Sequence, residues 1–111
     1  MQIEKLESAS AATLKITGEI DLHASPELRD RLQECAKAKT PLLLLDFTGV
    51  DYIDSSGLAT LIEYVREIGG FGGRLVLFGL QKKVRTIFDL VRLNELFVIT
   101  DTAEEAALAA K

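Results

Sequence analysis

The stretch Leu42-Leu43-Leu44-Leu45-Asp46-Phe47 decides the fold, because its apolar residues follow one another without alternating with polar ones. A strand with one face in water alternates, whereas a short unbroken apolar run is typical of a strand covered on both faces. Pro41 stands just before the run and Gly49 shortly after it, and both residue types favour the ends of elements. We therefore predict a buried, central strand here.

The chain after this run alternates between helical and strand patterns. Apolar residues three or four positions apart predict a helix over about residues 56–68, and a second buried strand follows over residues 74–78. A third helix, a short strand over residues 96–99 and a last helix complete the pattern. The third helix carries an apolar stripe of Val84, Ile87, Phe88 and Val91, and the capping-box pattern Thr102-Ala103-Glu104-Glu105 opens the last helix. Strands that alternate with helices in this way pair in parallel.

The chain before the central strand begins differently. Leu14 and Ile16 alternate with polar residues, and Ile3 and Leu6 lie in a shorter apolar stretch, so we expect two strands joined through the small residues 8–11 as an antiparallel hairpin. Ser25-Pro26-Glu27 then combines an N-cap residue, a proline and an acid, which predicts the start of the first helix. The apolar row of that helix consists of Leu28, Leu32 and Cys35.

Length and composition fit one globular domain. The 111 residues are 48% hydrophobic and 27% charged, close to the average of folded proteins. We therefore predict a single α/β domain over residues 1–111, with a mixed β-sheet, an N-terminal antiparallel hairpin and about four helices.

Charge and cysteine content exclude several classes of function. The net charge of −4 and the pI near 5.0 argue against a nucleic-acid partner and against direct contact with an anionic membrane. One cysteine and one histidine cannot make a structural zinc site, so we expect no metal, and we interpret Cys35 as a core residue. The N-terminus has no apolar signal segment, which makes the cytoplasm the expected compartment.

The segment Asp51-Tyr52-Ile53-Asp54-Ser55-Ser56-Gly57 carries the chemistry. We expect it to form a loop at the carboxyl end of the central strand, where such sheets place functional groups. The free backbone N–H groups that begin the next helix favour an oxyanion or a phosphate, and Ser55 is placed to carry one. The simpler interpretation is that Asp54 or Ser55 only caps the helix. Local spacing leaves both interpretations open.

Two motifs together point to a family. Asp54-Ser55-Ser56-Gly57-Leu58 after an aliphatic strand, with Thr17-Gly18-Glu19-Ile20-Asp21 earlier in the chain, resembles the STAS domain of bacterial anti-sigma factor antagonists. The likeness covers nearly the whole chain. It implies a partner-switching protein that, unphosphorylated, binds an anti-sigma factor that is also a serine kinase and so frees the sigma factor. Phosphorylation by that kinase ends the association, and a phosphoserine phosphatase resets the switch.

The resemblance also assigns residues. The phosphoacceptor falls on Ser55, its flanking acid and glycine on Asp54 and Gly57, and a surface acid on Asp21. With Ser56 these make up the expected partner-binding set, and Asp51 adds to an acidic face that suits a basic patch on the partner. A phosphate on Ser55 is expected to sit on the helix donors without unfolding the domain, so that the switch is local.

Other assignments fit less well. Ser56 competes as acceptor, but it is expected inside the first helical turn with its hydroxyl on a backbone group. His23 lacks a nucleophile and an orienting acid, and there is no Gly-x-Ser-x-Gly or P-loop motif, so we expect no enzyme and no cofactor. Asp46, near the end of the central strand, is a candidate for the phosphoacceptor acid of a response-regulator receiver. The chain lacks the acidic pair that such a receiver needs near the end of its first strand. The basic residues Lys82, Lys83 and Arg85 are interpreted as a solvated helix face. The remaining alternative is a STAS subunit of a transporter or a stress-sensing complex.

Overall fold

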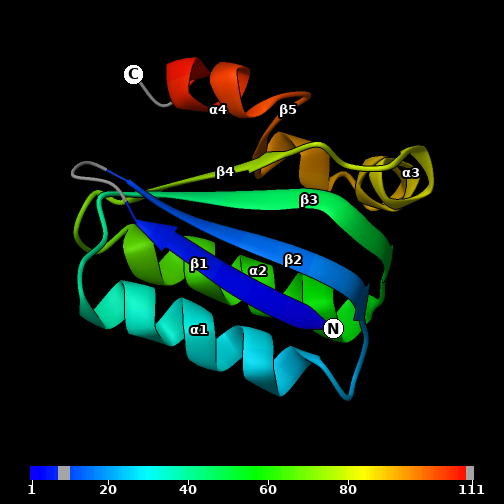
Figure 1. Cartoon of the computed structure of the whole chain (residues 1–111), viewed down its shortest axis with the longest axis horizontal. Coiled ribbons are helices and arrows are strands. Elements are labelled where there is room, and N and C mark those ends of the chain that lie inside the picture. Colours follow the sequence, from blue (N-terminus) through cyan, green and yellow to red (C-terminus); the bar gives the residue numbers. More distant parts are fainter. Residues whose placement is uncertain (8–10, 110–111) are drawn as a thin grey trace.

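A computed structural model of the protein describes residues 1–7 and 11–109 (Figure 1). Its sheet has five strands in the order β1-β2-β3-β4-β5. Strand β1 is antiparallel to β2, and the other neighbours are parallel. The strands are β1 (Gln2–Glu7), β2 (Ala12–Ile20), β3 (Leu42–Ile53), β4 (Arg74–Phe78) and β5 (Val98–Thr100). The predicted mixed sheet with an N-terminal antiparallel pair is confirmed, while the link at residues 8–10 lies outside the described residues.

Strand β3 lies in the centre of the sheet, as predicted from its run of leucines. Leu43 and Leu45 are fully buried in the larger core, and Leu44 is buried in a smaller core with Val76 and Phe78. Neighbouring residues of β3 thus pack into two different cores, which explains why the sequence shows no alternation. The central strand is the shared wall between them.

Strand β3 is longer than predicted. Residues 51–53, which we expected in a loop, belong to the strand and pair with the end of β2, with Glu19 opposite Tyr52 and Ile20 opposite Ile53. Two irregularities in the register between β2 and β3 precede this pairing. A bulge of this kind interrupts the side-chain pattern on which the prediction rested.

The helices lie on both sides of the sheet in Figure 1. Helices α1 (Ser25–Lys37) and α2 (Ser55–Ile68) lie side by side against one face. Helix α4 (Ala103–Ala109) covers the other face, where Ala106 joins the smaller core. Helix α3 (Lys82–Leu90) packs at one end of the sheet. There the ring of Phe88 lies edge-on to Phe47 and Phe97, with centroids 6.3 and 5.8 Å apart.

Three local predictions need correction, and one is confirmed. Ser25 is the first residue of α1 rather than its cap, because Ala24 holds the cap position without any side-chain bond. Val91 is 52% exposed rather than buried, and β5 begins only at Val98 because the 3₁₀ turn η1 (Leu93–Glu95) precedes it. The predicted start of α4 at Thr102 is confirmed, since the Glu105 backbone N–H donates to the Thr102 hydroxyl over 3.1 Å; the Glu105 carboxylate accepts from that hydroxyl at 3.2 Å rather than from a backbone N–H.

Tyr64 is a conspicuous exception to good polar pairing in the core. Its side chain is 1% exposed, and within residues 1–7 and 11–109 its hydroxyl has no hydrogen-bond partner. A buried hydroxyl without a partner costs about 1–3 kcal/mol of desolvation. Burial also raises the pKa of Tyr64, so the hydroxyl stays neutral.

We therefore expect Tyr64→Phe to raise the free energy of unfolding by about 1 kcal/mol, because it removes the unpaired hydroxyl and keeps the ring. Urea unfolding followed by circular dichroism measures the change. The matched control is Tyr52→Phe, at a side chain that is 45% exposed, which should change stability by less than about 0.5 kcal/mol. A destabilised Tyr64→Phe protein would show that the hydroxyl is paired in solution.

Candidate functional site

The candidate site lies where β2 and β3 end and α1 and α2 begin. The Asp54 backbone N–H donates to the Ile20 carbonyl over 3.1 Å, which ties the end of β3 to the end of β2. Helix α2 starts at the next residue, Ser55. The segment follows the carboxyl end of β3, as predicted, and the carboxyl ends of parallel strands are where this class of fold carries its functional groups.

Asp54 caps helix α2 with its side chain. Its backbone is extended, and its Oδ1 atom accepts hydrogen bonds from the backbone N–H groups of Ser56, at 2.9 Å, and Gly57, at 3.2 Å. The Ser56 hydroxyl donates to the same oxygen over 2.5 Å. The capping interpretation of Asp54 is therefore confirmed. The expectation that these N–H groups are free for a phosphate is wrong, because the carboxylate already uses two of them.

The same contacts set the charge of Asp54. The hydrogen bond from the Ser56 hydroxyl lowers the pKa of the Asp54 carboxyl; burial opposes this, and the backbone N–H groups of Gly57, Ser56 and Leu22 lower the pKa further. Asp54 is thus a carboxylate at neutral pH. It supplies the negative charge that the N-terminus of a helix favours.

Ser55 occupies the first position of α2, and its side chain is exposed. No other group in the described part of the chain makes a hydrogen bond to its hydroxyl. An exposed hydroxyl without a partner is accessible to an enzyme and loses no contact when it is modified. Ser55 is also the residue to which the family resemblance assigns the phosphoacceptor.

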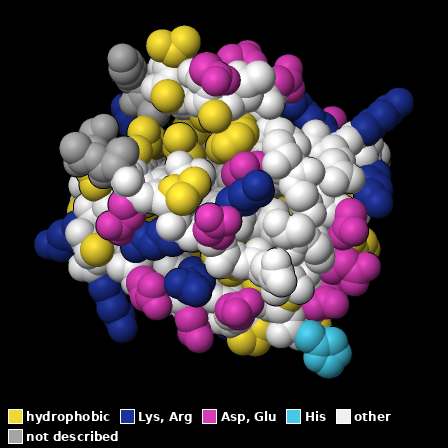
Figure 2. Space-filling view, in the orientation of Figure 1, with side chains coloured by type: hydrophobic (Ala, Val, Ile, Leu, Met, Phe, Trp, Pro, Cys, Tyr) yellow, Lys and Arg dark blue, Asp and Glu magenta, His cyan; other side chains and the backbone are white. Residues whose placement is uncertain are grey.

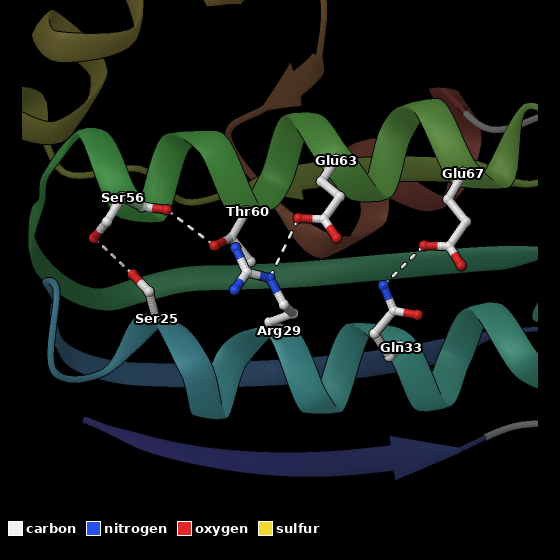
Figure 3. Close-up of polar contacts among 7 residues, drawn as sticks. All are labelled: Ser25, Arg29, Gln33, Ser56, Thr60, Glu63 and Glu67. Carbon is white, nitrogen blue, oxygen red and sulfur yellow. Dashed lines mark hydrogen bonds and ion pairs between the residues drawn. The ribbon is translucent and has the colours of Figure 1, made fainter.

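Ser56 points the other way, into the space between the two helices (Figure 3). Its hydroxyl oxygen lies 2.8 Å from the hydroxyl oxygen of Ser25 on α1, in addition to its bond to Asp54. We had expected the Ser56 hydroxyl to bond to a backbone group. It bonds to two side chains instead, and it is the Ser56 carbonyl that accepts a bond, from the Thr60 hydroxyl at 2.9 Å.

Asp21 fixes the turn that leads into α1. Its Oδ1 atom accepts from the backbone N–H groups of His23 and Ala24, both at 3.0 Å, and its carbonyl accepts from the Ser25 hydroxyl at 2.8 Å. The side chain is half-buried, so part of this carboxylate remains at the surface. The structure thus brings Asp21, Asp54, Ser55 and Ser56 to one end of the molecule, joined through Ser25.

Known proteins are similar to this chain in sequence and in fold. The sequence profile described as STAS domain matches residues 2–106. The chain belongs to the STAS domain family. An anti-sigma-B factor antagonist of Bacillus subtilis (strain 168) is 30% identical over 91 residues, which are 82% of this chain and 83% of the relative.

Solved structures show the same fold for this STAS domain. An anti-sigma factor antagonist from Mycobacterium paratuberculosis superposes with a TM-score of 0.89 at 21% identity, covering 98% of this chain and 92% of that one. SpoIIAA of Bacillus, described as a cell fate determinant, matches in its phosphorylated form with a TM-score of 0.73 at 22% identity, over 99% and 98% of the two chains. Its unphosphorylated form has the same TM-score.

Gly57 has a packing role in this STAS domain. It is buried, and a Cβ atom at this position would lie 2.7 Å from Ile20 Cγ2 and 2.8 Å from Ile53 Cγ1. Only glycine lets the first turn of α2 approach the ends of β2 and β3 this closely. The glycine therefore sets the position from which Ser55 points outward.

Two further contacts hold the helices of the STAS domain together (Figure 3). The Arg29 side chain forms an ion pair with Glu63 at 3.2 Å, and the Gln33 amide donates to Glu67 over 2.9 Å. Both lie on the exposed side of the seam between α1 and α2, and exposed pairs of this kind contribute modestly to stability. Their arrangement continues the line of contacts that begins at Ser25 and Ser56.

The remaining candidates form no second site. The Asp46 carboxylate accepts from the Thr48 backbone N–H at 2.9 Å and the Thr48 hydroxyl at 2.6 Å, so its contacts are local ones within β3. Within residues 1–7 and 11–109, no group of three or more His, Cys, Asp or Glu side chains is arranged to hold a metal ion. Cys35 is fully buried, as predicted.

We expect Gly57→Ala to lower the free energy of unfolding by about 1–3 kcal/mol, because the added methyl group forces two isoleucine side chains and the helix apart. Urea unfolding measures the loss. In the control Gly70→Ala the nearest atom, the Glu67 carbonyl oxygen, lies at an ordinary contact distance of 3.4 Å, so no comparable loss is expected. Equal effects of the two substitutions would rule out the packing role of Gly57.

The Asp54 cap predicts a pH dependence. Because the folded-state pKa of Asp54 is lowered, its contribution to stability is fully present above the ordinary value of 3.8 and is lost as the pH falls through the folded-state pKa. Asp54→Asn should therefore be less stable than the parent at pH 7, and the difference should shrink below about pH 4. Urea titrations across this range measure it, and a difference independent of pH would contradict the assignment.

Proposed function

We propose that this STAS domain is an anti-sigma factor antagonist controlled by phosphorylation of Ser55. Unphosphorylated, it binds an anti-sigma factor that is also a serine kinase and so releases the sigma factor. Phosphorylation by that kinase ends binding, and a phosphoserine phosphatase restores it. The observation that carries the proposal is the exposed hydroxyl of Ser55 at the start of α2, to which no group among residues 1–7 and 11–109 makes a hydrogen bond. The names of the curated relatives support the class of function.

Geometry favours Ser55 over Ser56 as the phosphoacceptor. The Ser56 hydroxyl is half-buried and bonded to Asp54 and Ser25, so a kinase would have to break both contacts and enter between two helices. Phosphorylation of Ser55 requires neither the loss of these contacts nor entry between the helices. The more accessible hydroxyl is also the one that the family motif assigns.

The charge of the site supports a block by phosphate. The modification adds about −1.5 to −2 charges at neutral pH. Asp21 and Asp54 already lie at this end of the molecule, and the exposed Glu19 and Asp51 flank it, so a partner fitted to this face carries basic groups. Figure 2 shows acidic side chains gathered on the side where β2 and β3 end. A bulky phosphate disturbs a surface fitted to a neutral hydroxyl, and a loss of about 3 kcal/mol corresponds to roughly hundredfold weaker binding.

The partner-binding residues divide into two groups. Ser55, Asp21 and Asp54 reach the surface and can contact a partner, although both carboxylates also hold backbone N–H groups. Ser56 and the buried Gly57 do not face the partner. Ser56 holds the Asp54 cap in place, and Gly57 sets the position of α2. We infer that substitutions in the second group weaken binding indirectly.

In this proposal the chain is a regulatory protein that has no catalytic activity and no cofactor of its own. It acts in the cytoplasm and binds neither nucleic acid nor a membrane. Among the helices of the described residues, none is both long and apolar enough to cross a membrane. The alternative, a subunit of a transporter or a stress-sensing complex, would have a permease or a multi-protein assembly as its partner. A purification of the tagged protein from its source cells separates the two functions by the identity of what is retained.

We expect Ser55→Ala to abolish phosphorylation and to keep binding to the anti-sigma factor kinase, while Ser55→Asp weakens binding at least tenfold because it adds a charge. The dissociation constants are measured by calorimetry, and the modified residue is found by mass spectrometry. The matched control is Thr86→Asp, which adds the same charge to an exposed hydroxyl position on α3 and should bind normally. Phosphate on the Ser55→Ala protein would remove Ser55 from its role.

A further inference from the structure

The N-terminus of α2 already carries an anion. Asp54 accepts the N–H groups of Ser56 and Gly57 and the hydroxyl of Ser56 on a single oxygen, Oδ1. These N–H groups belong to the first turn, where the partial positive charge of the helix is concentrated. A phosphate on Ser55 would have to displace this carboxylate before it could use the same donors.

The contacts between hydroxyl groups show how Asp54 is held. The hydroxyls of Ser25 and Ser56 take part in three contacts, with the Asp21 carbonyl, with each other and with Asp54, yet they have only two protons between them. The charged carboxylate takes the proton of Ser56, because a bond to an ionised acceptor is the strongest of the three. Ser25 is then the donor in its contact with Ser56, in competition with the Asp21 carbonyl.

Ser25 therefore strengthens the hydrogen bond from the Ser56 hydroxyl to the Asp54 carboxylate. A hydroxyl that accepts one hydrogen bond becomes a better donor in the next, so the chain from Ser25 through Ser56 to Asp54 is cooperative. Ser25 is 4% exposed and lies at the start of α1, which is held against α2 by the Arg29–Glu63 and Gln33–Glu67 pairs. The chain of hydroxyls is thus supported by two packed helices.

We propose that Asp54 keeps the N-terminus of α2 closed to a phosphate on Ser55, and that Ser25 is the positioning residue that holds Asp54 there through Ser56. This proposal rests on the proposed function, which places the phosphate on Ser55. Its consequence is that the phosphate is not neutralised by the domain. It stays at the surface beside a carboxylate, and its full charge faces the partner.

The proposal can be tested without any partner or kinase. Phosphoserine is introduced at position 55 during synthesis by an expanded genetic code, and its second pKa is measured by ³¹P NMR. We expect this pKa to lie about 0.5 above that of the urea-unfolded protein, because a like charge a few ångströms away disfavours the dianion. Asp54→Asn should lower it again. The other ionisable groups near the phosphate, Glu19, Asp21, His23 and Asp51, are unchanged in that comparison.

A phosphate that is bound by the N-terminus of α2 would give a different second pKa. Held by the helix, it would have a second pKa below the unfolded value. That observation would overturn the proposal while leaving phosphorylation as a switch intact. Conversely, equal partner affinity of the two phosphorylation states would refute the proposed function and leave this measurement unaffected.

Ser25 is tested with a closely matched control. Ser25→Ala and Thr60→Val each remove a buried hydroxyl that donates to a backbone carbonyl, and the two side chains are 4% and 2% exposed. Of these two hydroxyls, that of Ser25 contacts the Ser56 hydroxyl, whereas that of Thr60 contacts the Ser56 carbonyl. We expect Ser25→Ala alone to lower the phosphoserine pKa toward the unfolded value, because the phosphate now competes for the helix donors, and Ser25→Thr to restore it. If Ser25→Ala and Thr60→Val leave the same pKa as the parent, Ser25 is not a positioning residue.

Discussion

The carboxylate of Asp54 is the contact on which this end of the molecule depends. Its backbone joins β3 to β2 through the Ile20 carbonyl, and its side chain begins α2 by accepting the N–H groups of Ser56 and Gly57. Through Ser56 and Ser25 it also reaches α1. Asp54 therefore contacts the strands through its backbone and the helices through its carboxylate, which the donors around it keep charged at neutral pH.

This arrangement places two neighbouring serines in different environments. Ser56 is turned inward, and its hydroxyl is used in the contact between the helices, while Ser55 is turned outward with a free hydroxyl. The separation follows from helical geometry, because consecutive residues on a helix point about 100° apart. We infer that a rigid frame around a single free hydroxyl suits a surface whose binding is controlled by one modification, since little else in the domain has to move.

The sequence predicted the features that depend on local pattern. The leucine run of β3 could be predicted to be a central strand because both of its faces are buried. Asp54 could be predicted to be a cap because it stands just before the apolar stripe of a helix. The Ser25–Ser56 contact was not predictable, because it joins residues 31 positions apart and Ser25 looked like a cap from its neighbours alone. The length of β3 was missed because a bulge hides its last residues. Whether α2 is open to a phosphate depends on where the Asp54 carboxylate points, and the local sequence left the cap and the phosphate interpretations open.

We propose that the charge at Ser55 governs association with an anti-sigma factor kinase. The most direct measurement is the dissociation constant of that partner for two preparations of the chain, one unmodified and one carrying phosphoserine at position 55, at the same ionic strength. We expect the modified chain to bind roughly a hundredfold more weakly, with an unchanged amide spectrum away from the start of α2. Equal dissociation constants for the two preparations would contradict the claim.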